Sequence, residues 1–471
     1  MGLFSSLKGA FTKMFSREDV TKAFGLTTDV SSEMMNALEV WHTLFTRSCS
    51  NLPSVVAGEA ARLATVDMHI TFSGGERAEY LQMVFNQNKD RFRSKLELGC
   101  AYGGLILKPT ATGIDFIPAF RYLPIEYDSN GNITAVVFID SFTSNDNYYT
   151  RLEYHHFELL EEGSVYVIEN KAFLSKTKFA LGRQVDLGRV SKWAHLEPIT
   201  YISGVDKPLF GYFRTPIANN IDIDSPLGVS IFSKAIDSLR DFDMAYDKWR
   251  REIKLSDKVL FVDEQAMMKP SEGERGGRAV ACNPIPELVK GLRFGNNASK
   301  CIEEYNPTLR VDEFKQTLQT QLDLISVQCG FSAGYFSFDE KTGAVTATQI
   351  ESNDQRTIST CTDIQQNYKL AIEGLVYAME VYLTLYDLAP EEEVNTSYYM
   401  RDLGVNVSED RDRAYQLAQN GFIPKWKYLV DYEGYSEEEA KEMVRLAKKE
   451  EEEDNADNNA GKTQQKTGDA E

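Results

Sequence analysis

The chain has 471 residues, of which 42% are hydrophobic and 11% aromatic, so it is long enough for two to four domains and apolar enough to fold. Its 51 Lys and Arg residues against 71 Asp and Glu residues give a formal net charge of −20. Domains that grip nucleic acid by neutralising phosphates are usually basic, so this charge argues against such a clamp but allows a protein that surrounds nucleic acid without holding it.

The cysteines are expected to be reduced and mostly buried. No two of them have the C-x-x-C spacing of a zinc site, no secretory signal is visible, and no apolar run has the length needed to span a bilayer. We therefore expect no metal, no cofactor and no membrane partner. The six positions are Cys49, Cys100, Cys282, Cys301, Cys329 and Cys361.

The first 97 residues show mainly helical spacing of apolar side chains. Residues 1–27 are expected to form a helical arm. Its start, Met1 to Ser6, fits the myristoylation pattern, but we favour a packing helix that matches this short pattern by chance. The spacing then predicts helices over 31–45, 57–64 and 77–98, with a strand over 66–72.

From Gly99 to about Phe213 the pattern changes to short segments rich in branched and aromatic residues. Turn signals of the hairpin type separate them, among them residues 129–132, which read Ser-Asn-Gly-Asn, and 161–163, which read Glu-Glu-Gly. The pattern predicts an antiparallel meander of strands over 105–109, 114–118, 133–139, 148–158, 164–170 and 172–179.

Two helices are predicted to flank a small unit. Asp224, Ser225 and Pro226 form a helix-start signal, a capping residue followed by proline in the first turn, and the helix is expected to end near residue 254. Its apolar stripe lies opposite a charged face. A second helix is predicted over 311–329. Residues 257–309, with strands over 258–262 and 278–282 and a polar loop over 270–277, would be held at the far ends of the two helices.

A glycine-punctuated loop and a very long helix follow. The loop, residues 330–343, carries Phe331, Tyr335, Phe336 and Phe338. The helix is predicted over 348–388 and would run roughly 60 Å. A helix of that length either crosses a large domain or packs against neighbouring copies of the chain.

The C-terminal part is predicted to contain one strand and three helices. The strand, residues 395–400, is expected to return to the meander. The helices are expected over 409–420, 424–432 and 436–450, and the acidic and polar tail after them is expected to be disordered. The fold class is therefore α+β.

The sequence offers no credible active site. His156 and Glu158 share one face of a predicted strand, which leaves only a two-ligand metal option, and we expect a surface pair instead. Asp222 and Asp224 are a possible carboxylate pair for Mg²⁺, although a turn and helix cap explain them better. We expect that the protein is not an enzyme.

Several local motifs, together with the order of the parts, resemble the portal proteins of tailed bacteriophages, in the subgroup from phages of Gram-positive hosts. The likeness covers nearly the whole chain and is most specific over 208–253. The matching motifs are Tyr154-His-His-Phe-Glu158, Ile168-Glu-Asn-Lys171, Pro208-Leu-Phe-Gly-Tyr-Phe-Arg-Thr-Pro216, Ala218-Asn-Asn220, Ser225-Pro-Leu-Gly-Val-Ser230 and Thr346-Ala-Thr348.

The resemblance implies a ring, expected to contain twelve subunits, at one vertex of the phage capsid. Double-stranded DNA would be packaged through its channel by the large terminase subunit and later ejected through it. Further partners would be head–tail connector proteins, the major capsid protein and scaffolding proteins. The protein would occur in the virion, and in the host cytoplasm during assembly.

The resemblance also divides the chain into the parts described for portal subunits. These would be an N-terminal arm (1–27), a wing (28–225), a first stem helix (226–256), a clip (257–309), a second stem helix (310–328), a tunnel loop (329–347), a long wing helix with a returning strand (348–406), a crown (407–455) and a disordered tail (456–471).

The implied functional residues fall into three groups. Lys341 is the only basic side chain of the tunnel loop, and it would either touch passing phosphates or simply be solvated. The other loop residues expected at the channel are Gly334, Thr342, Gly343 and Thr346. The clip residues expected to bind terminase or connector are Glu272, Glu274, Arg275 and Arg278. The residues expected at the interface between subunits are Phe232, Trp249 and Phe314.

The acidity suits a channel, because an acidic wall repels phosphate and lets DNA slide. Twelve copies at −20 each would carry on the order of −240 charges in the reference ionisation states. Two alternatives from other classes remain open. One is an acidic Mg²⁺-dependent DNA-processing enzyme that uses Asp222 and Asp224, and the other is a monomeric scaffold or adaptor protein.

Overall fold

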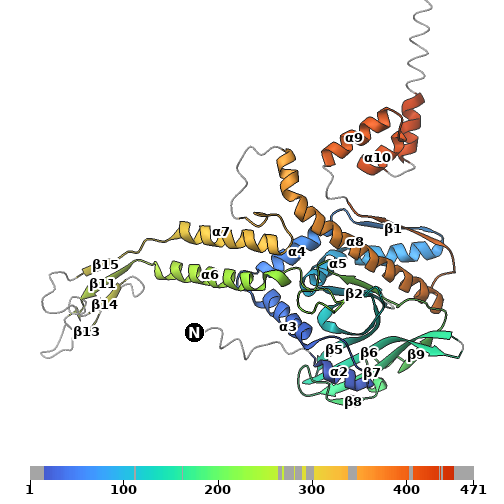
Figure 1. Cartoon of the computed structure of the whole chain (residues 1–471), viewed down its shortest axis with the longest axis horizontal. Coiled ribbons are helices and arrows are strands. Elements are labelled where there is room, and N and C mark those ends of the chain that lie inside the picture. Colours follow the sequence, from blue (N-terminus) through green and yellow to red (C-terminus); the bar gives the residue numbers. More distant parts are fainter. Residues whose placement is uncertain are drawn as a thin grey trace, which may run out of the picture. The chain divides into compact units, whose positions relative to one another are not determined.

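The computed structural model describes residues 15–110, 113–161, 163–263, 268–269, 280–281, 289–292, 302–337, 347–401, 407–433, 435 and 439–449. The chain divides into two compact units, Met1–Arg401 and Asp402–Glu471. It mixes helices with largely antiparallel sheets, as the predicted α+β class requires (Figure 1).

The N-terminal helices confirm the predicted helical start of the chain. They are α2 (Arg17–Phe24), α3 (Ser32–Arg47), α4 (Leu52–Ala64) and α5 (Glu76–Tyr102). The Ser31 hydroxyl caps α3 by accepting a hydrogen bond from the Met34 amide. The alanines of α4 are fully buried, which lets α4 lie close against α5. Residues 1–14, with the myristoylation pattern, lie outside the described residues.

The strand-rich segment forms two sheets. The predicted meander is a sheet in the order β4-β5-β6-β7-β8, and β9 also pairs with β7. Its strands are β4 (Tyr122–Tyr127), β5 (Ile133–Ser144), β6 (Asn147–Leu160), β7 (Gly163–Ser175), β8 (Arg183–Val185) and β9 (Ile199–Ile202). The second sheet, in the order β10-β2-β3, contains β2 (Gly104–Thr110), β3 (Gly113–Pro118) and β10 (Gly211–Arg214). Short 3-10 turns lie at η1 (Ala119–Arg121) and η2 (Leu187–Arg189).

Three details of the strand prediction were wrong. The segments 164–170 and 172–179 are the single strand β7 up to Ser175, because β6 pairs with it without a break from Tyr148 to Leu160. Strands β4, β8, β9 and β10 were missed. The first two predicted strands, 105–109 and 114–118, pair with each other, and the first also pairs with β10, so neither belongs to the meander. The turn at 129–132 is confirmed, since the Asp128 amide donates to Asn132 O and Gly131 has a φ of 76°.

The helix predicted to start at Asp224 begins later. A 3-10 turn, η3 (Ser233–Ala235), leads into α6 (Ile236–Leu255). The chain before it is buried and bonded to other elements: the Ile231 amide donates to Cys100 O, and Val229 O accepts from the Thr215 hydroxyl. Because these backbone groups are already paired outside a helix, the capping signal starts no helix here.

The long helix α8 (Ala347–Leu385) crosses the unit and confirms the predicted helix to within three residues at its end (Figure 1). It packs on β10, β2 and α4. Glycines permit this close approach, because the Cβ of an alanine at Gly374 would lie 2.9 Å from the Cα of Gly211. The fully buried apolar stripe of α8 includes Cys361, Ile364, Tyr368, Ile372 and Leu375.

Strand β16 (Val394–Tyr399) is confirmed as a strand, but it pairs with β1 (His69–Gly74) and not with the meander. The Arg77 guanidinium directs the segment between α8 and β16 toward β1. It donates to Pro390 O at 2.9 Å and to Thr384 Oγ1 at 2.7 Å, so it ties the segment after α8 to the first turn of α5. The chain therefore continues beside β1.

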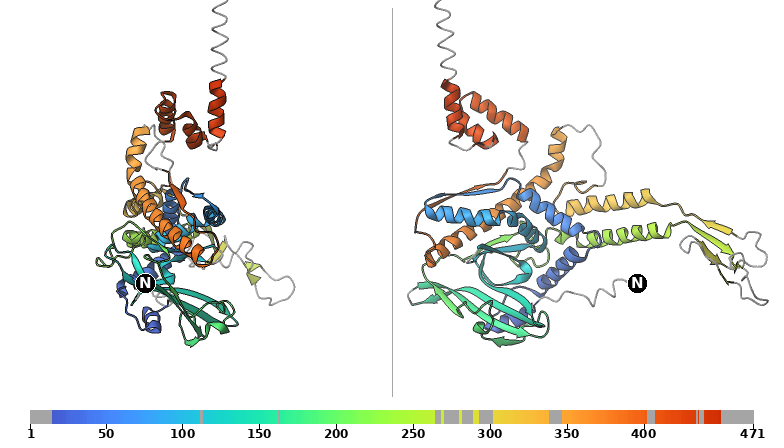
Figure 2. Two further views of the ribbon diagram at one scale, coloured as in Figure 1. Left: turned by 90° about the vertical axis from the view of Figure 1, so that its right-hand side faces the viewer. Right: turned by 180° about the vertical axis from the view of Figure 1, so that it is seen from behind.

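Helices α6 and α7 (Val311–Gln328) lie side by side in Figure 1 and in the right view of Figure 2 and confirm the predicted pair. The segment between them contains β11 (Val259–Asp263), which pairs in parallel with β14 (Val289–Leu292) and antiparallel with β15 (Ile302–Tyr305). Strands β12 (Met268–Lys269) and β13 (Val280–Ala281) form a second small pair. Of this segment, residues 264–267, 270–279, 282–288 and 293–301 lie outside the described residues.

The C-terminal unit is helical in its described part. It contains α9 (Val407–Gln419) and α10 (Lys425–Glu433), and residues 439–449 are also helical. The rings of Tyr415 and Tyr428, whose centroids are 5.5 Å apart, join α9 to α10. The predicted capping box at 436–439 and the tail after 449 fall outside the described residues, apart from Glu439.

The contact between α8 and β10 generates the first testable prediction. Replacing Gly211 with alanine would push its Cβ into the carbonyl oxygen of Ala371, and neither backbone can move without disturbing the core. We expect Gly211→Ala to destabilise the protein by about 3 kcal/mol or more. The measurement is the midpoint of urea unfolding of the purified chain.

Gly58→Ala is the matched control. Gly58 lies within α4, and an added Cβ would meet only the flexible Glu97 side chain at 3.5 Å. Alanine is favoured over glycine inside a helix by about 0.5–1 kcal/mol. This variant should be as stable as the original protein or more so. Equal effects of the two substitutions would show that the α8–β10 contact is not tightly packed.

Candidate functional site

The paired helices α6 and α7 pack against the core of their unit at one end only. Leu239 and Phe242 of α6, with Leu318, Leu322 and Ile325 of α7, are buried there. No side chain is buried further from the core, in α6 residues 243–255 and α7 residues 311–317. The structure describes all of these residues. Two helices alone cannot cover both of their apolar stripes.

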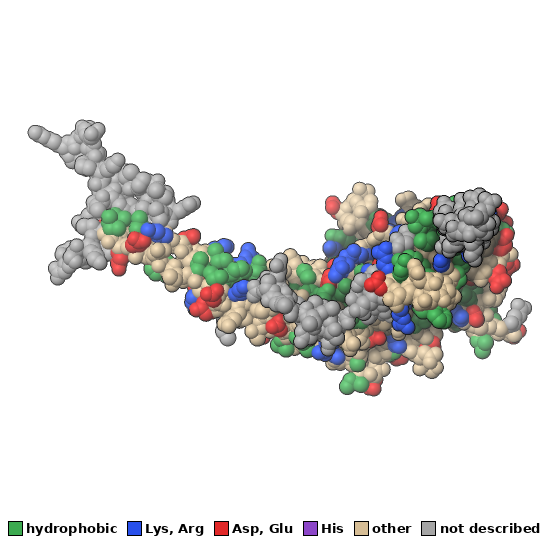
Figure 3. All heavy atoms as spheres, turned by 90° about the horizontal axis from the view of Figure 1, so that it is seen from above, with side chains coloured by type: hydrophobic (Ala, Val, Ile, Leu, Met, Phe, Trp, Pro, Cys, Tyr) green, Lys and Arg blue, Asp and Glu red, His purple; other side chains and the backbone are tan. Residues whose placement is uncertain are grey.

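Apolar side chains are consequently exposed along the pair. Figure 3 shows hydrophobic groups on the surface of this narrow part of the unit. They include Met244, Ile253, Leu255, Val311 and Leu324, each between 39% and 61% exposed. Between the helices lies a groove, whose lining includes Met244, Ala245, Lys248, Arg310 and Phe314. An exposed apolar surface of this kind is typical of an interface.

Charged residues occupy the rest of the pair. Near its far end, the Arg310 guanidinium forms a two-pronged ion pair with the Glu252 carboxylate, with both N–O distances 2.9 Å. This hydrogen bonding lowers the pKa of Glu252 and raises the pKa of Arg310. The predicted charged face of α6 is confirmed as exposed: Lys234, Asp237, Arg240, Asp241, Asp247, Lys248, Arg250 and Arg251.

The loop after α7 is anchored in the core over its described part, residues 330–337. Phe331 is fully buried, and its ring centroid lies 5.1 Å from those of Tyr335 and Phe336. The Thr360 hydroxyl on α8 donates to Gly330 O at 2.7 Å, and the Tyr335 hydroxyl donates to the carboxylate of Glu59 on α4. The aromatic side chains therefore anchor this half of the loop to the core, with Phe331 buried and Tyr335 and Phe336 half-buried.

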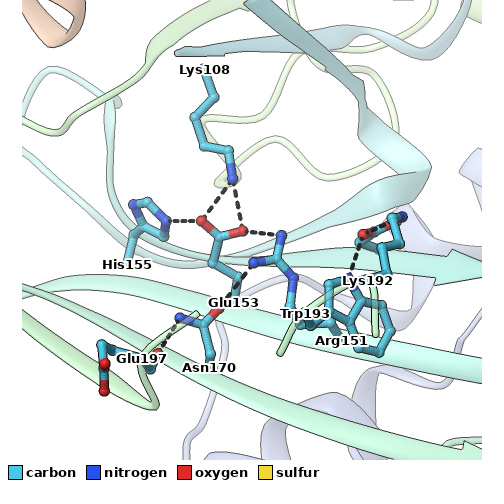
Figure 4. Close-up of polar contacts among 9 residues, drawn as sticks. Lys108, Arg151, Glu153, His155, Asn170, Lys192, Trp193 and Glu197 are labelled. Carbon is cyan, nitrogen blue, oxygen red and sulfur yellow. Dashed lines mark hydrogen bonds and ion pairs between the residues drawn. The ribbon is translucent and has the colours of Figure 1, made fainter. Parts of the chain in front are cut away.

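A buried cluster of charged groups joins the two sheets (Figure 4). Lys108 of β2 reaches Glu153 of β6, with its Nζ 2.7 Å from both carboxylate oxygens. Arg151 lies 2.8 Å from the same carboxylate. The ring of His155 contacts Glu153 through Nε2 at 2.8 Å and the Tyr166 hydroxyl through Nδ1 at 2.9 Å. We call Lys108, Arg151, Glu153 and His155 the Glu153 cluster.

The electrostatics of this cluster favour an ionised carboxylate and a neutral imidazole. Burial opposes the charge of Glu153, but Lys108 and Arg151 more than compensate and hold its pKa well below the ordinary value. Burial lowers the pKa of His155 despite the nearby carboxylate. Neutral His155 then donates from Nε2 to Glu153 and accepts from Tyr166 at Nδ1. Both ring nitrogens of His155 are therefore satisfied, as in a structural hydrogen-bond network.

Comparison with known families decides the identity. A family model described as phage portal protein, SPP1 Gp6-like, matches residues 82–456. The chain belongs to this family of phage portal proteins. The match begins within α5 and includes the helix pair, the loop and α8. A search of curated proteins finds no match.

Membership confirms the resemblance seen in the sequence. The protein is a phage portal protein, a component of the capsid associated with genome packaging and with the joining of head and tail. The family is structural rather than catalytic. Among the described residues, no helix is long and apolar enough to cross a membrane.

The structure describes only some of the residues expected to function in this portal protein. Gly334 is described and has a φ of 74°, which suits glycine. Phe232 has no solvent exposure within the single chain, and Trp249 and Phe314 are half-buried. The remaining expected residues lie outside the described part: Lys341, Thr342, Gly343 and Thr346 of the loop, and Glu272, Glu274, Arg275 and Arg278 between the helices.

The carboxylates considered for Mg²⁺ lie in a turn. The amides of Ile221 and Asp222 donate to Asn219 Oδ1, and Ser225 N donates to Asp222 O. Among the residues that the structure describes, no group of three potential metal ligands includes Asp222 or Asp224.

Sequence reasoning missed the Glu153 cluster. A signal was present, because Lys108 follows three apolar residues in β2, and Glu153 lies between Leu152 and Tyr154 in β6. A charge inside an apolar strand pattern indicates either a bulge or a buried pair. The pairing itself could not be read, since it joins two sheets whose relative placement the sequence does not show.

The Glu153 cluster generates the second prediction. Glu153→Gln leaves the buried Lys108 and the partly buried Arg151 without their counter-charge, so we expect a loss of about 3–5 kcal/mol at pH 7, measured by urea unfolding. Glu126→Gln, which changes an exposed carboxylate on β4, should have little effect.

The pH dependence of the protein's stability follows from the directions in which folding shifts the pKa values of buried and half-buried groups. The pKa of Glu153 is lowered on folding, so its stabilisation is present above pH 4.5 and is lost as pH falls through the depressed value. The pKa values of His155 and His42 are also lowered, so stability should begin to fall below pH 6.5. A Gln variant as stable as the original at pH 7, or a penalty that grows in acid, would contradict this description.

Proposed function

We propose that this portal protein forms a ring of twelve subunits at one capsid vertex. The ring is the channel through which terminase packages double-stranded DNA, and through which the DNA is later ejected. The observation that carries the proposal is the family match, which spans the helix pair, the loop and the long helix in one chain.

The helix pair supports assembly through its uncovered apolar side chains. Met244 and Leu324 are 39% and 50% exposed, and Trp249 and Phe314 of the same two helices are half-buried. Contact with the next copy would remove this surface from water, with a gain of about 25 cal/mol for each Å² of apolar area. Trp249 and Phe314 would therefore contribute to the interface, whereas Phe232 supports the base of the pair within its own subunit.

We assign the parts of a portal subunit as follows. The wing contains residues 28–225 and 348–406, the stem contains 226–256 and 310–328, and the crown contains 407–455. Residues 257–309 form the clip, where Glu272, Glu274, Arg275 and Arg278 would bind terminase and then the head–tail connector. In support, the polar segments of the clip are connected to the rest of the chain by α6 and α7.

The loop between α7 and α8 is proposed as the part that meets DNA. Its first half is fixed by Phe331 and by the hydrogen bond from Thr360, so its second half starts from a rigid base. Lys341 would make brief contacts with passing phosphates, assisted by Thr342 and Thr346. Gly334 and Gly343 would supply backbone freedom on either side. Phosphate contacts without base recognition allow any sequence to pass.

The third prediction tests this function in a phage-production assay. The variant removes part of residues 338–346 and keeps the anchored residues 330–337. We expect heads in normal number but with slower or incomplete DNA filling, because the anchor and the interface are retained. The measurements are head counts by electron microscopy and the length of protected DNA.

Deletion of residues 456–471, which the sequence predicts to be disordered, serves as the control and should change neither readout. Lys341→Ala tests the phosphate contact alone and should slow filling with no change in head number. If the shortened loop packages DNA at the normal rate and to the normal length, the loop does not serve DNA passage.

A further inference from the structure

Three potential metal ligands come together on one face of the meander. His156 and Glu158 lie on β6, and Glu169 lies on the neighbouring strand β7. One ring nitrogen of His156 and one oxygen of each carboxylate lie within 4.8 Å of one another, the only group of this kind among the described residues. The register explains it, since Tyr154 is opposite Glu169 and His156 is opposite Val167, which places Glu169 diagonally across from His156.

The imidazole of His156 is held rigidly and is incompletely satisfied. Its side chain is only 10% exposed, and its ring stacks on Tyr154 with a centroid distance of 4.2 Å. Nε2 lies 3.1 Å from Glu158 Oε1. Nδ1 is buried and has no hydrogen-bond partner among the described residues. Nε2 is therefore the nitrogen that an ion beside Glu158 would meet, with the ring proton then on Nδ1.

The two carboxylates leave the cluster open to an ion from solution. Their side chains are 41% exposed for Glu158 and 25% exposed for Glu169. Lys171 is the nearby cation, with its Nζ 4.0 Å from Glu169. That ammonium also donates to Ala23 O at 3.0 Å and lies over the Phe24 ring. Lys171 is therefore held toward α2 and does not occupy the space between the three ligands.

We propose that His156, Glu158 and Glu169 bind one divalent transition-metal ion, for which Zn²⁺ is the best match. Zinc accepts imidazole nitrogen and carboxylate oxygen at about 2.0–2.2 Å, and a tetrahedral site then needs ligand atoms about 3.4 Å apart. The two carboxylates, which are partly exposed, would rotate toward the ion to close the present spacing. Water would complete the coordination, and the ion would cross-link β6 to β7 on the face of the sheet that Phe24 of α2 contacts.

The chemistry favours zinc over the alkaline-earth ions. Mg²⁺ and Ca²⁺ prefer sites made of oxygen ligands alone, whereas an imidazole ligand suits zinc and its neighbours. The sequence alone suggested only the pair His156 and Glu158. The third ligand lies on another strand and becomes visible only with the register.

The test uses the purified full-length chain after treatment with a chelator. Zn²⁺ is titrated by calorimetry, Co²⁺ is titrated by visible absorption, and melting temperature is recorded with and without Zn²⁺. We expect one ion per chain with micromolar affinity, a visible Co²⁺ band and a rise in melting temperature. Glu158→Gln and Glu169→Gln should each weaken Zn²⁺ binding about tenfold or more. Both change partly exposed residues, so the metal-free proteins should melt like the original.

Glu161→Gln is the control, since Glu161 is an exposed carboxylate near the same hairpin and lies outside the cluster. It should retain the affinity for Zn²⁺. The proposal is overturned if no stoichiometric binding is seen. It is also overturned if Glu169→Gln binds Zn²⁺ as tightly as the original, because the ion would then be held elsewhere. Equal binding of Mg²⁺ at the same concentration would likewise contradict a site built on an imidazole.

Discussion

The close contact between α8 and β10 is the constraint on which the rest of the structure depends. Gly211 and Gly374 meet with no space for a side chain, so the helix backbone lies directly on the strand. This contact fixes α8 against the β10-β2-β3 sheet. The Tyr368 hydroxyl extends the attachment to Phe92 O on α5 at 3.1 Å. A helix held at this separation cannot shift without opening the core.

The helix pair is connected to this core through the loop that follows α7. Cys329 and Phe331 are buried at the junction, and Ser332 and Gly330 bond to Thr357 and Thr360 of α8. On the other side, the Asp243 carboxylate of α6 accepts hydrogen bonds from Ser48 and Ser50 before α4. The base of the pair is therefore rigid while the apolar surface farther along it remains uncovered. A rigid base with an uncovered apolar surface is suited to docking against identical copies.

Much of the fold was predictable, and the errors have identifiable physical causes. Helices α5, α7 and α8 carry apolar residues at regular spacing and begin or end within a few residues of prediction. The segment before α6 has a capping signal, but its backbone is already bonded to Cys100 and Thr215. Strand β16 was recognised, whereas its partner depended on the hydrogen bonds of Arg77. Periodicity reports local structure and does not report these distant contacts.

The candidate site was predictable to a smaller extent. The resemblance to portal proteins came from motifs spread over the chain, and the family match confirms it. The Glu153 cluster and the group of His156, Glu158 and Glu169 depend on which strands are neighbours and in which register. One sequence contains the residues of such clusters but not their pairing.

The central claim is that the uncovered helix pair assembles copies of the chain into a ring. Native mass spectrometry of the purified full-length protein, with electron micrographs of the same sample, tests it most directly. We expect a closed ring with twelve times the mass of the 53.3-kDa chain, about 640 kDa. A strictly monomeric protein at micromolar concentration, together with an absence of rings in phage heads, would contradict the claim.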